Sequence, residues 1–405
     1  MERSDRIMNE KYPMIFSPDS IGNVELKNRI VMSAMGMNQS DDGFVTDAVL
    51  EHYAVRARGG IGLIIVEVSC VDAPLGKNTG NSLVIDNDKY IPGMQKLTDV
   101  IHAAGTKCFL QISHAGRGAF RRITGMQPVA PSAVSMPYST MMELSNETPR
   151  ELTVKEIHNI EEKYAQAAFR AKKAGFDGVE IHNTGYYLGQ QFLSSVANVR
   201  TDEYGGNREN RIRFLLNIIR RIRELCGNEF PIAVKLSVVE SGEDAGITMK
   251  DGIYYAKRLQ DVGVNAIEVL AGVWSGTKGN VAKAVDEECQ MTGLCQILKR
   301  EIRKMTGKNS TIKMIGGGHV QYPQAAEKAL EAHQCEFIFV GRELLVQPDF
   351  VKLIEEGRED EIKHCIGCGT CSRVQLQKGE TCRCVLNPDV GQMIKENISI
   401  LLLPI

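Results

Sequence analysis

GVEIHNTGYYLGQQFLSSVANVRTDEYGG, residues 178–206, is the stretch that decides the fold. It opens with a short apolar strand that starts at Gly178, and it ends in a polar, glycine-rich segment. His182, Tyr186 and Tyr187 follow directly after the strand. In a barrel of parallel strands, catalytic side chains gather at the carboxyl ends of the strands. If the sheet closes into such a barrel, these three side chains lie at its active end.

Apolar strand-like runs alternate with amphipathic helical patterns through most of the 405 residues. This alternation indicates βαβ units and a parallel sheet. We expect strands at residues 30–32, 63–68, 107–112, 178–181, 232–236, 266–270, 312–315 and 337–340. The clearest helices are expected at residues 154–173, 208–225, 251–262 and 324–332. Eight such units favour an α/β fold of the (β/α)8 TIM-barrel type over an open doubly wound sheet.

Two long insertions interrupt the alternation. Residues 117–150 are rich in Pro, Ser and Met, and we expect a hairpin and loop over the barrel mouth. Residues 272–288 are glycine-rich and contain Trp274, the only tryptophan. Loops of this length often act as functional lids, and a plain surface excursion is an equally good interpretation. Beyond Asp349 the barrel pattern stops, and residues 355–363 read as a charged helix or linker.

Composition and charge exclude several classes of function. The chain is 43% hydrophobic and 24% charged, which is ordinary for a globular protein. Its net charge of −2 gives no electrostatic case for nucleic acid or an anionic membrane. No apolar run approaches the roughly 20 residues of a spanning helix, and no apolar signal region follows residues 1–11. We therefore expect a cytoplasmic protein that acts on a small molecule.

The opening stretch resembles the fourth strand and following loop of the old yellow enzyme family, which are flavin-dependent reductases built on a (β/α)8 barrel. The matching segments are EIH at 180–182, QFLS at 191–194 and RTDEYGG at 200–206. The resemblance covers roughly residues 12–390. It implies an FMN-binding barrel over residues 1–355.

The family pattern at this place is E-I-H-x-x-[HN]-G-Y, and it aligns here without a gap. His182 then falls on the histidine that grips a substrate carbonyl or carboxyl oxygen, and Tyr187 falls on the proton donor. The second His or Asn of the family falls on Gly185, so we expect His182 to grip alone or with help from a loop. A shift by one residue would make Tyr186 the donor, but only with compensating gaps.

The resemblance also assigns residues to the flavin ring. Ser33, Ala34 and Met35 end the first strand, where the family commonly has Ala-Pro-Met against the ring. Gln111 matches the glutamine that bonds the pyrimidine edge, and an amide can both donate and accept there. Lys235 matches a basic residue, often arginine, near flavin N1 and O2, where a cation stabilises the anionic reduced flavin.

Glycines at the ends of the seventh and eighth strands match a phosphate site. Gly317 and Gly318 follow one strand, and Gly341 and Arg342 follow the next. Barrels of this kind bind phosphate at these two ends. Glycine lets backbone N–H groups approach phosphate oxygens, and the arginine adds a charged fork. A glycine run alone is more often a turn, so the pairing with Arg342 carries this prediction of FMN.

Five of the eleven cysteines crowd into residues 365–384. The pattern C-x2-C-x2-C-x12-C suits a [4Fe–4S] cluster, with ligands Cys365, Cys368, Cys371 and Cys384. It resembles the cluster loop of the family branch that contains trimethylamine dehydrogenase, dienoyl-CoA reductase and 2-enoate reductase. Cys382 competes as fourth ligand at a shorter interval, and a four-cysteine zinc site is the main alternative. Disulfides are less favoured in a cytosolic setting.

These matches suggest three segments: the barrel, a cluster segment at residues 356–392, and residues 393–405 as the start of an absent or truncated C-terminal domain. No G-x-G-x-x-G follows a predicted strand anywhere in the chain. The resemblance implies an FMN-dependent ene-reductase that reduces an activated C=C bond in an enoate, a dienoyl-CoA, or an unsaturated ketone or steroid. Electrons would arrive through the cluster from a ferredoxin or flavoprotein, with NAD(P)H as a direct or indirect donor.

Two other functions stay open at this point. One is an amine or ether dehydrogenase, which the cluster spacing favours, although the amine branch has tyrosine at the place of His182. The other is an electron-transfer subunit whose barrel chemistry is altered, as Gly185 would allow. The sequence leaves open the substrate, the direction of the reaction and the oligomeric state.

Overall fold

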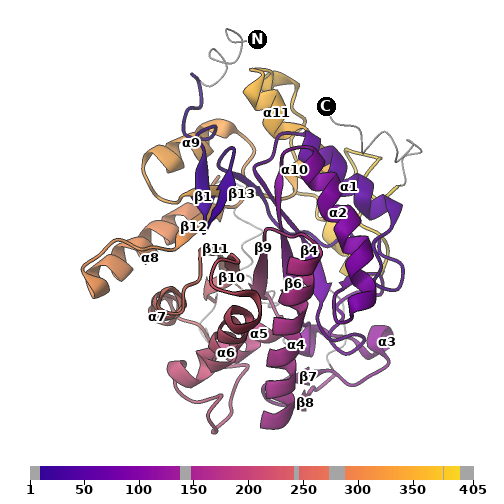
Figure 1. Ribbon diagram of the computed structural model, residues 1–405, viewed down its shortest axis with the longest axis vertical. Coiled ribbons are helices and arrows are strands. Elements are labelled where there is room, and N and C mark those ends of the chain that lie inside the picture. The colour runs from indigo at the N-terminus through magenta and orange to yellow at the C-terminus, as the bar shows by residue number, and fades with distance from the viewer. Residues whose placement is uncertain (1–9, 137–146, 241–245, 273–287, 377, 393–405) are drawn as a thin grey trace.

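A computed structural model of the chain describes residues 10–136, 147–240, 246–272, 288–376 and 378–392. Eight parallel strands form a closed barrel (Figure 1). They are β3 (Ile30–Met32), β4 (Leu63–Cys70), β6 (Lys107–Ser113), β9 (Gly178–Asn183), β10 (Ile232–Val239), β11 (Ala266–Ala271), β12 (Lys313–Gly317) and β13 (Phe337–Val340). Each pairs with the next, and β13 pairs with β3 to close the ring. The predicted (β/α)8 barrel is confirmed.

Helices surround the strands (Figure 1). The longer ones are α1 (Asp47–Arg58), α2 (Ile91–Ala103), α4 (Val154–Lys173), α6 (Arg208–Cys226), α7 (Met249–Asp261), α8 (Gln290–Thr306) and α9 (Pro323–Glu331). The amphipathic pattern explains their packing: α4 starts at a capping box of Thr153 and Glu156 and buries Ile157, Ile160 and Tyr164 on one face. Within the described residues, no helix is both long and apolar enough to cross a membrane.

The barrel interior is filled with apolar side chains at its amino-terminal end. Ile65, Phe109 and Phe337 belong to this interior cluster and are fully buried. A hairpin of β1 (Asp19–Ile21) and β2 (Val24–Leu26) adds Ile21 and Leu26 to the same cluster. Because this end is plugged, the carboxyl ends of the strands are left for a binding site.

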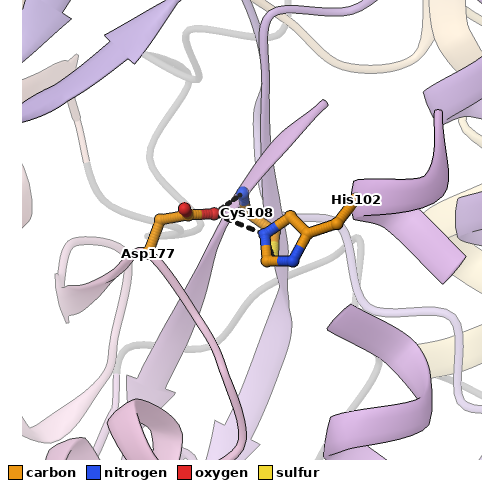
Figure 2. Close-up of side chains that lie close together, drawn as sticks. All are labelled: His102, Cys108 and Asp177. Carbon is orange, nitrogen blue, oxygen red and sulfur yellow. Dashed lines mark hydrogen bonds and ion pairs between the residues drawn. The ribbon is translucent and has the colours of Figure 1, made fainter. Parts of the chain in front are cut away.

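A polar cluster ties α2 to the amino-terminal ends of β6 and β9 (Figure 2). His102 Nε2 lies 2.7 Å from Asp177 Oδ2, which also accepts the backbone N–H of Cys108 at 2.9 Å. The other oxygen of Asp177 lies 3.2 Å from Lys107 Nζ. Among the described residues, His102, Cys108 and Asp177 are the one group with three potential metal-ligand atoms within 4.8 Å. Since both carboxylate oxygens already have protein partners, we interpret the cluster as a structural ion pair.

We expected a hairpin in residues 117–150. For the described part of that insertion, this prediction is wrong. There, β7 (Val129–Ala130) pairs with β8 (Arg150–Glu151) in parallel. The reason is a clamp outside the insertion: Arg200 Nη1 donates to Pro131 O at 2.7 Å and to Leu152 O at 2.6 Å. Residues 137–146 lie outside the described residues, as do residues 273–287 with Trp274.

Short helices follow the barrel proper. Outside the ring are α10 (Glu343–Val346) and α11 (Phe350–Glu355), and then a single 3-10 turn at Glu359–Glu361 within the predicted charged linker. A further helix, α12 (Thr370–Leu376), lies inside the cysteine segment. Its glutamine Gln375 donates from Nε2 to Gly36 O, which ties the segment to the loop after β3. The cysteine segment therefore packs on the open end of the barrel.

Candidate functional site

A cavity of about 520 Å³ lies at the carboxyl ends of the strands. It brings together ten of the eleven residues predicted for catalysis or flavin binding: Ser33, Ala34, Met35, Gln111, His182, Tyr187, Lys235, Gly318, Gly341 and Arg342. Gly317 ends β12 instead, where an added Cβ would meet Phe339 O at 2.4 Å. The cavity therefore joins residues from six of the barrel strands and the loops that follow them.

One wall of the cavity carries a buried charged group. Lys235 Nζ lies 2.7 Å from Glu268 Oε1 and donates to Ser33 Oγ at 2.6 Å. Burial opposes the charge of Lys235, but Glu268 and then Glu180 outweigh it and hold its pKa above the ordinary value. An ammonium has three N–H donors, so one is left for a ligand in the cavity.

Gln111 lines the same cavity as Lys235, and a glutamate on the neighbouring strand fixes the orientation of its amide. Its Nε2 donates to Glu180 Oε1 at 2.7 Å, between paired residues of β6 and β9. Burial, followed by the charge of Glu268, raises the pKa of Glu180 to about 8. The amide oxygen of Gln111 takes part in no hydrogen bond with the described residues and stays free to accept one.

Another part of the cavity wall is suited to an anion. Gly318 has φ +93°, a conformation that favours glycine, and Gly341 lies next to Arg342. The guanidinium of Arg342 forms no hydrogen bond or ion pair with any described residue, although it is half-buried. A half-buried guanidinium without a partner among the described residues, beside glycines of the cavity wall, suits a phosphate.

His182 and Tyr187 form a further part of the cavity wall. Their ring centroids lie 4.1 Å apart, and His182 Nδ1 has no hydrogen-bond partner among the described residues. Burial, and then the charge of Lys235, holds the pKa of His182 well below its ordinary value, so the imidazole is neutral. Burial raises the pKa of Tyr187 well above its ordinary value, so the phenol keeps its proton.

Tyr186 also lies on the cavity, stacked on Tyr187 with centroids 5.1 Å apart. Its other neighbours are apolar, namely Phe120, Met136 and Leu376. Gly185 has φ +65°, which explains a glycine at this turn. The two tyrosines therefore occupy different surroundings on one wall.

The cysteine segment reaches the cavity directly. Cys365 lies on the cavity wall, and its backbone N–H donates to Glu343 Oε2 at 3.0 Å. Cys368 is exposed, whereas Cys371 and Cys384 are partly buried against an apolar cluster that contains Met37 and Cys382. Cys382 is 2% exposed, and burial raises the pKa of its thiol.

Several cavity residues were not anticipated from the sequence. Asn78, in the loop after β4, donates from Nδ2 to the hydroxyl of Tyr187 at 2.8 Å. Gln375 and Leu376, from α12, complete the cavity wall. The sequence feature that could have indicated Asn78 is its position in a loop that follows a barrel strand. In barrels of this kind, these loops line the active site.

Comparisons with known proteins agree with this geometry. A sequence profile described as the NADH:flavin oxidoreductase / NADH oxidase family matches residues 14–361. An NADH oxidase of Thermoanaerobacter brockii is 40% identical over 94% of this chain and 57% of its own length. A cinnamate reductase of Clostridium sporogenes is 31% identical over 95% of this chain and 59% of its own.

A solved complex of 2-naphthoyl-CoA reductase with 2-naphthoyl-CoA superposes with a TM-score of 0.85 and is 29% identical. The match covers 94% of this chain and 58% of that one. The chain thus spans a little over half the length of these relatives. The profile match over most of the barrel, together with the cavity geometry, establishes that the chain belongs to the NADH:flavin oxidoreductase / NADH oxidase family of flavin-dependent oxidoreductases.

Proposed function

We propose that this protein is an FMN-dependent reductase of an activated C=C bond. The observation that carries the proposal is the wall formed by His182 and Tyr187, which faces a cavity that also holds Gln111, Lys235 and Arg342. A neutral donor–acceptor pair on a flavin cavity suits an α,β-unsaturated carbonyl compound. The names of relatives, cinnamate reductase and 2-naphthoyl-CoA reductase, support a conjugated acid or thioester as substrate.

The residues present fit FMN. Gln111 keeps a free amide oxygen and Lys235 a free N–H, which suit the pyrimidine edge of the ring. The half-buried Arg342 guanidinium and the glycines beside it suit the phosphate. When bound, FMN supplies the hydride for the reaction. The protein residues hold the ring edge, neutralise charge near it and bind the phosphate.

His182 and Tyr187 supply the remaining chemistry. A neutral imidazole donates one hydrogen bond, which would bind the carbonyl or carboxyl oxygen of the substrate and polarise the double bond. Tyr187 keeps its proton at neutral pH and would give it to the carbon atom opposite the hydride. Gly185 offers no second ligand for the oxygen, so the grip rests on His182.

We further propose that Cys365, Cys368, Cys371 and Cys384 hold a [4Fe–4S] cluster beside the flavin. Cys365 lies on the cavity wall, which would make electron transfer direct. The spacing C-x2-C-x2-C-x12-C supports this assignment, since four thiolates in this order suit such a cluster. A four-cysteine zinc site is the alternative that metal analysis would distinguish.

Electrons would reach the cluster from a ferredoxin or flavoprotein, with NAD(P)H as the ultimate or direct donor. The cysteine segment presents apolar side chains to solvent: Ile366 is 66% exposed, Val385 56% and Leu386 37%. Exposed apolar residues beside a redox centre suit a docking protein. The cluster segment at residues 356–392 would thus be the entry point for electrons.

A substrate panel tests the proposed function. Holoenzyme reduced without oxygen is mixed with cinnamate, a dienoyl-CoA, 2-naphthoyl-CoA or buffer, and oxidised holoenzyme is mixed with trimethylamine. Reoxidation of the flavin by one of the unsaturated acids or thioesters, with formation of the saturated product, is expected. Reduction of the oxidised flavin by the amine, with no response to any unsaturated compound, would contradict the proposal.

A further inference from the structure

The loop after β4 places one amide side chain in the catalytic wall. Asn78 is 9% exposed, lines the cavity and donates from Nδ2 to the hydroxyl oxygen of Tyr187 at 2.8 Å. The loop is anchored before and after Asn78, because Ala115 N–H donates to Gly76 O at 2.9 Å and Asn81 N–H donates to Asn38 Oδ1 at 2.8 Å. Asn78 is therefore held in place and does not sample open solvent.

The direction of this hydrogen bond matters for chemistry. The NH2 group of an amide can only donate, so the phenol oxygen is the acceptor and the phenol hydrogen is not used in this bond. That hydrogen can go to the hydroxyl of Tyr186, whose hydrogen bond raises the pKa of Tyr187, or to a ligand in the cavity. The other ring neighbours of Tyr187 are Tyr186, stacked at 5.1 Å, and His182 at 4.1 Å.

Asn78 also acts on the charge that proton donation leaves behind. A phenol that gives up its proton becomes a phenolate, and a donor on its oxygen stabilises that anion. Burial and the neighbouring Tyr186 both raise the pKa of Tyr187, whereas the bond from Asn78 lowers it. The neutral, buried His182 contributes no positive charge. Among the described contacts of Tyr187, the amide is thus the group that favours release of the proton.

We propose that Asn78 is a positioning residue for Tyr187, which orients the phenol hydrogen toward the substrate and stabilises the phenolate oxygen. The inference rests on the proposed function, in which Tyr187 is the proton donor. It adds a residue from the loop after β4 to the reaction and couples that loop to the catalytic wall.

Two substitutions separate orientation from bulk packing. Asn78→Leu keeps the size of the side chain and removes the donor. Asn78→Asp keeps the shape but replaces the donor with a carboxylate, which accepts the phenol hydrogen and reverses the bond. Asn78→Gln restores an amide as the conservative rescue. Asn81→Leu is the matched control, since Asn81 lies in the same loop, is exposed and does not line the cavity.

The rate of substrate-dependent flavin reoxidation is measured as a function of pH. The Tyr187 phenol is titrated independently by 13C NMR of labelled holoenzyme, and the Tyr187→Phe variant assigns its signal. We expect Asn78→Leu and Asn78→Asp to slow reoxidation at least tenfold and to move the alkaline limb and the NMR titration to higher pH. Asn78→Gln should recover part of the loss, and Asn81→Leu should match wild type.

Wild-type rates and an unmoved titration in both Asn78→Leu and Asn78→Asp would overturn the inference. Tyr187→Phe distinguishes this failure from a failure of the proposed function. If Tyr187→Phe is slow while both Asn78 variants are unaffected, only the positioning role is wrong. If Tyr187→Phe is itself unaffected, the donor assignment on which the inference rests is wrong.

Discussion

Gln111 donates from Nε2 to Oε1 of Glu180 at 2.7 Å, across the paired strands β6 and β9. This bond fixes which end of the Gln111 amide faces the cavity. A glutamate buried in the strand thereby sets the hydrogen-bonding character of a residue that lines the cavity. The orientation of the Gln111 amide is thus determined by residues on the barrel strands and not by the loops.

Replacing Glu180 with Gln should change how stability depends on pH. The pKa of Glu180 is raised to about 8, against about 4.3 in the unfolded chain. Between these values the folded state binds the extra proton, so wild-type stability falls as pH rises. Glu180→Gln lacks this proton and should gain stability relative to wild type from pH 5 to pH 8. Urea unfolding at both pH values measures the difference, and a constant difference would contradict the raised pKa.

The His102–Asp177 pair predicts the opposite dependence (Figure 2). Burial alone would raise the pKa of Asp177, but the bonds from His102 and from the Cys108 N–H outweigh it and lower the pKa. Its stabilisation is therefore present above the unfolded value of about 3.9 and is lost as pH falls through the lower folded value. Asp177→Asn should cost about 1.5–3 kcal/mol at pH 7. The gap should close at acid pH in denaturant titrations, and a gap that persists there would refute the assignment.

Arg342 should control the affinity for FMN. Its guanidinium has no partner among the described residues, and hydrogen bonds to a charged group contribute about 1.5–3 kcal/mol. Arg342→Ala should therefore weaken FMN binding by the apoprotein roughly 10- to 100-fold, which is measured by quenching of FMN fluorescence. Arg300→Ala, the same change at an exposed arginine on α8, serves as control. Equal affinities of the two variants would place the phosphate elsewhere.

The fourth cluster ligand can be decided by matched alanine substitutions. Cys382 is buried against Met37 and Leu345, and its backbone N–H donates to Met37 O at 2.9 Å, so we interpret it as a core residue. Cys384 is only partly buried. Protein prepared without oxygen should contain about four irons. Cys384→Ala should lose them and Cys382→Ala should keep them; the reverse pattern in metal analysis would exchange the two assignments.

Local patterns in the sequence predicted most of the barrel. The strand at 337–340 and the helix at 154–173 were predicted to the residue, because an unbroken apolar run and a capping box define their ends. Strands β4 and β10 extend two and three residues beyond the prediction, since polar residues such as Ser69 and Ser237 continue the strand inside the barrel. Strand length there is set by pairing with neighbours and not by hydrophobicity.

The missed features depend on contacts between distant segments. The parallel pairing of β7 and β8 relies on Arg200, which is far from both in sequence. Asn78 enters the site through a loop with no periodic pattern, and α12 is hidden in a cysteine-rich segment. Of the residues predicted to bind the flavin, only Gly317 does not line the cavity, because its backbone packs against Phe339. The residue type alone indicates that a glycine or an amide could line a binding site. Packing between distant segments then decides which glycine or amide lies on the cavity wall.

The central claim is that Tyr187 donates a proton during reduction of an activated C=C bond. Stopped-flow reoxidation of the reduced holoenzyme by cinnamate tests it most directly. Because phenylalanine cannot give up a proton, Tyr187→Phe should slow reoxidation by about 10²–10⁴-fold, while reduction of the flavin by its electron donor is unchanged. Tyr186→Phe should reoxidise close to the wild-type rate. If Tyr187→Phe matches wild type, or if Tyr186→Phe carries the loss, the account of the site is contradicted.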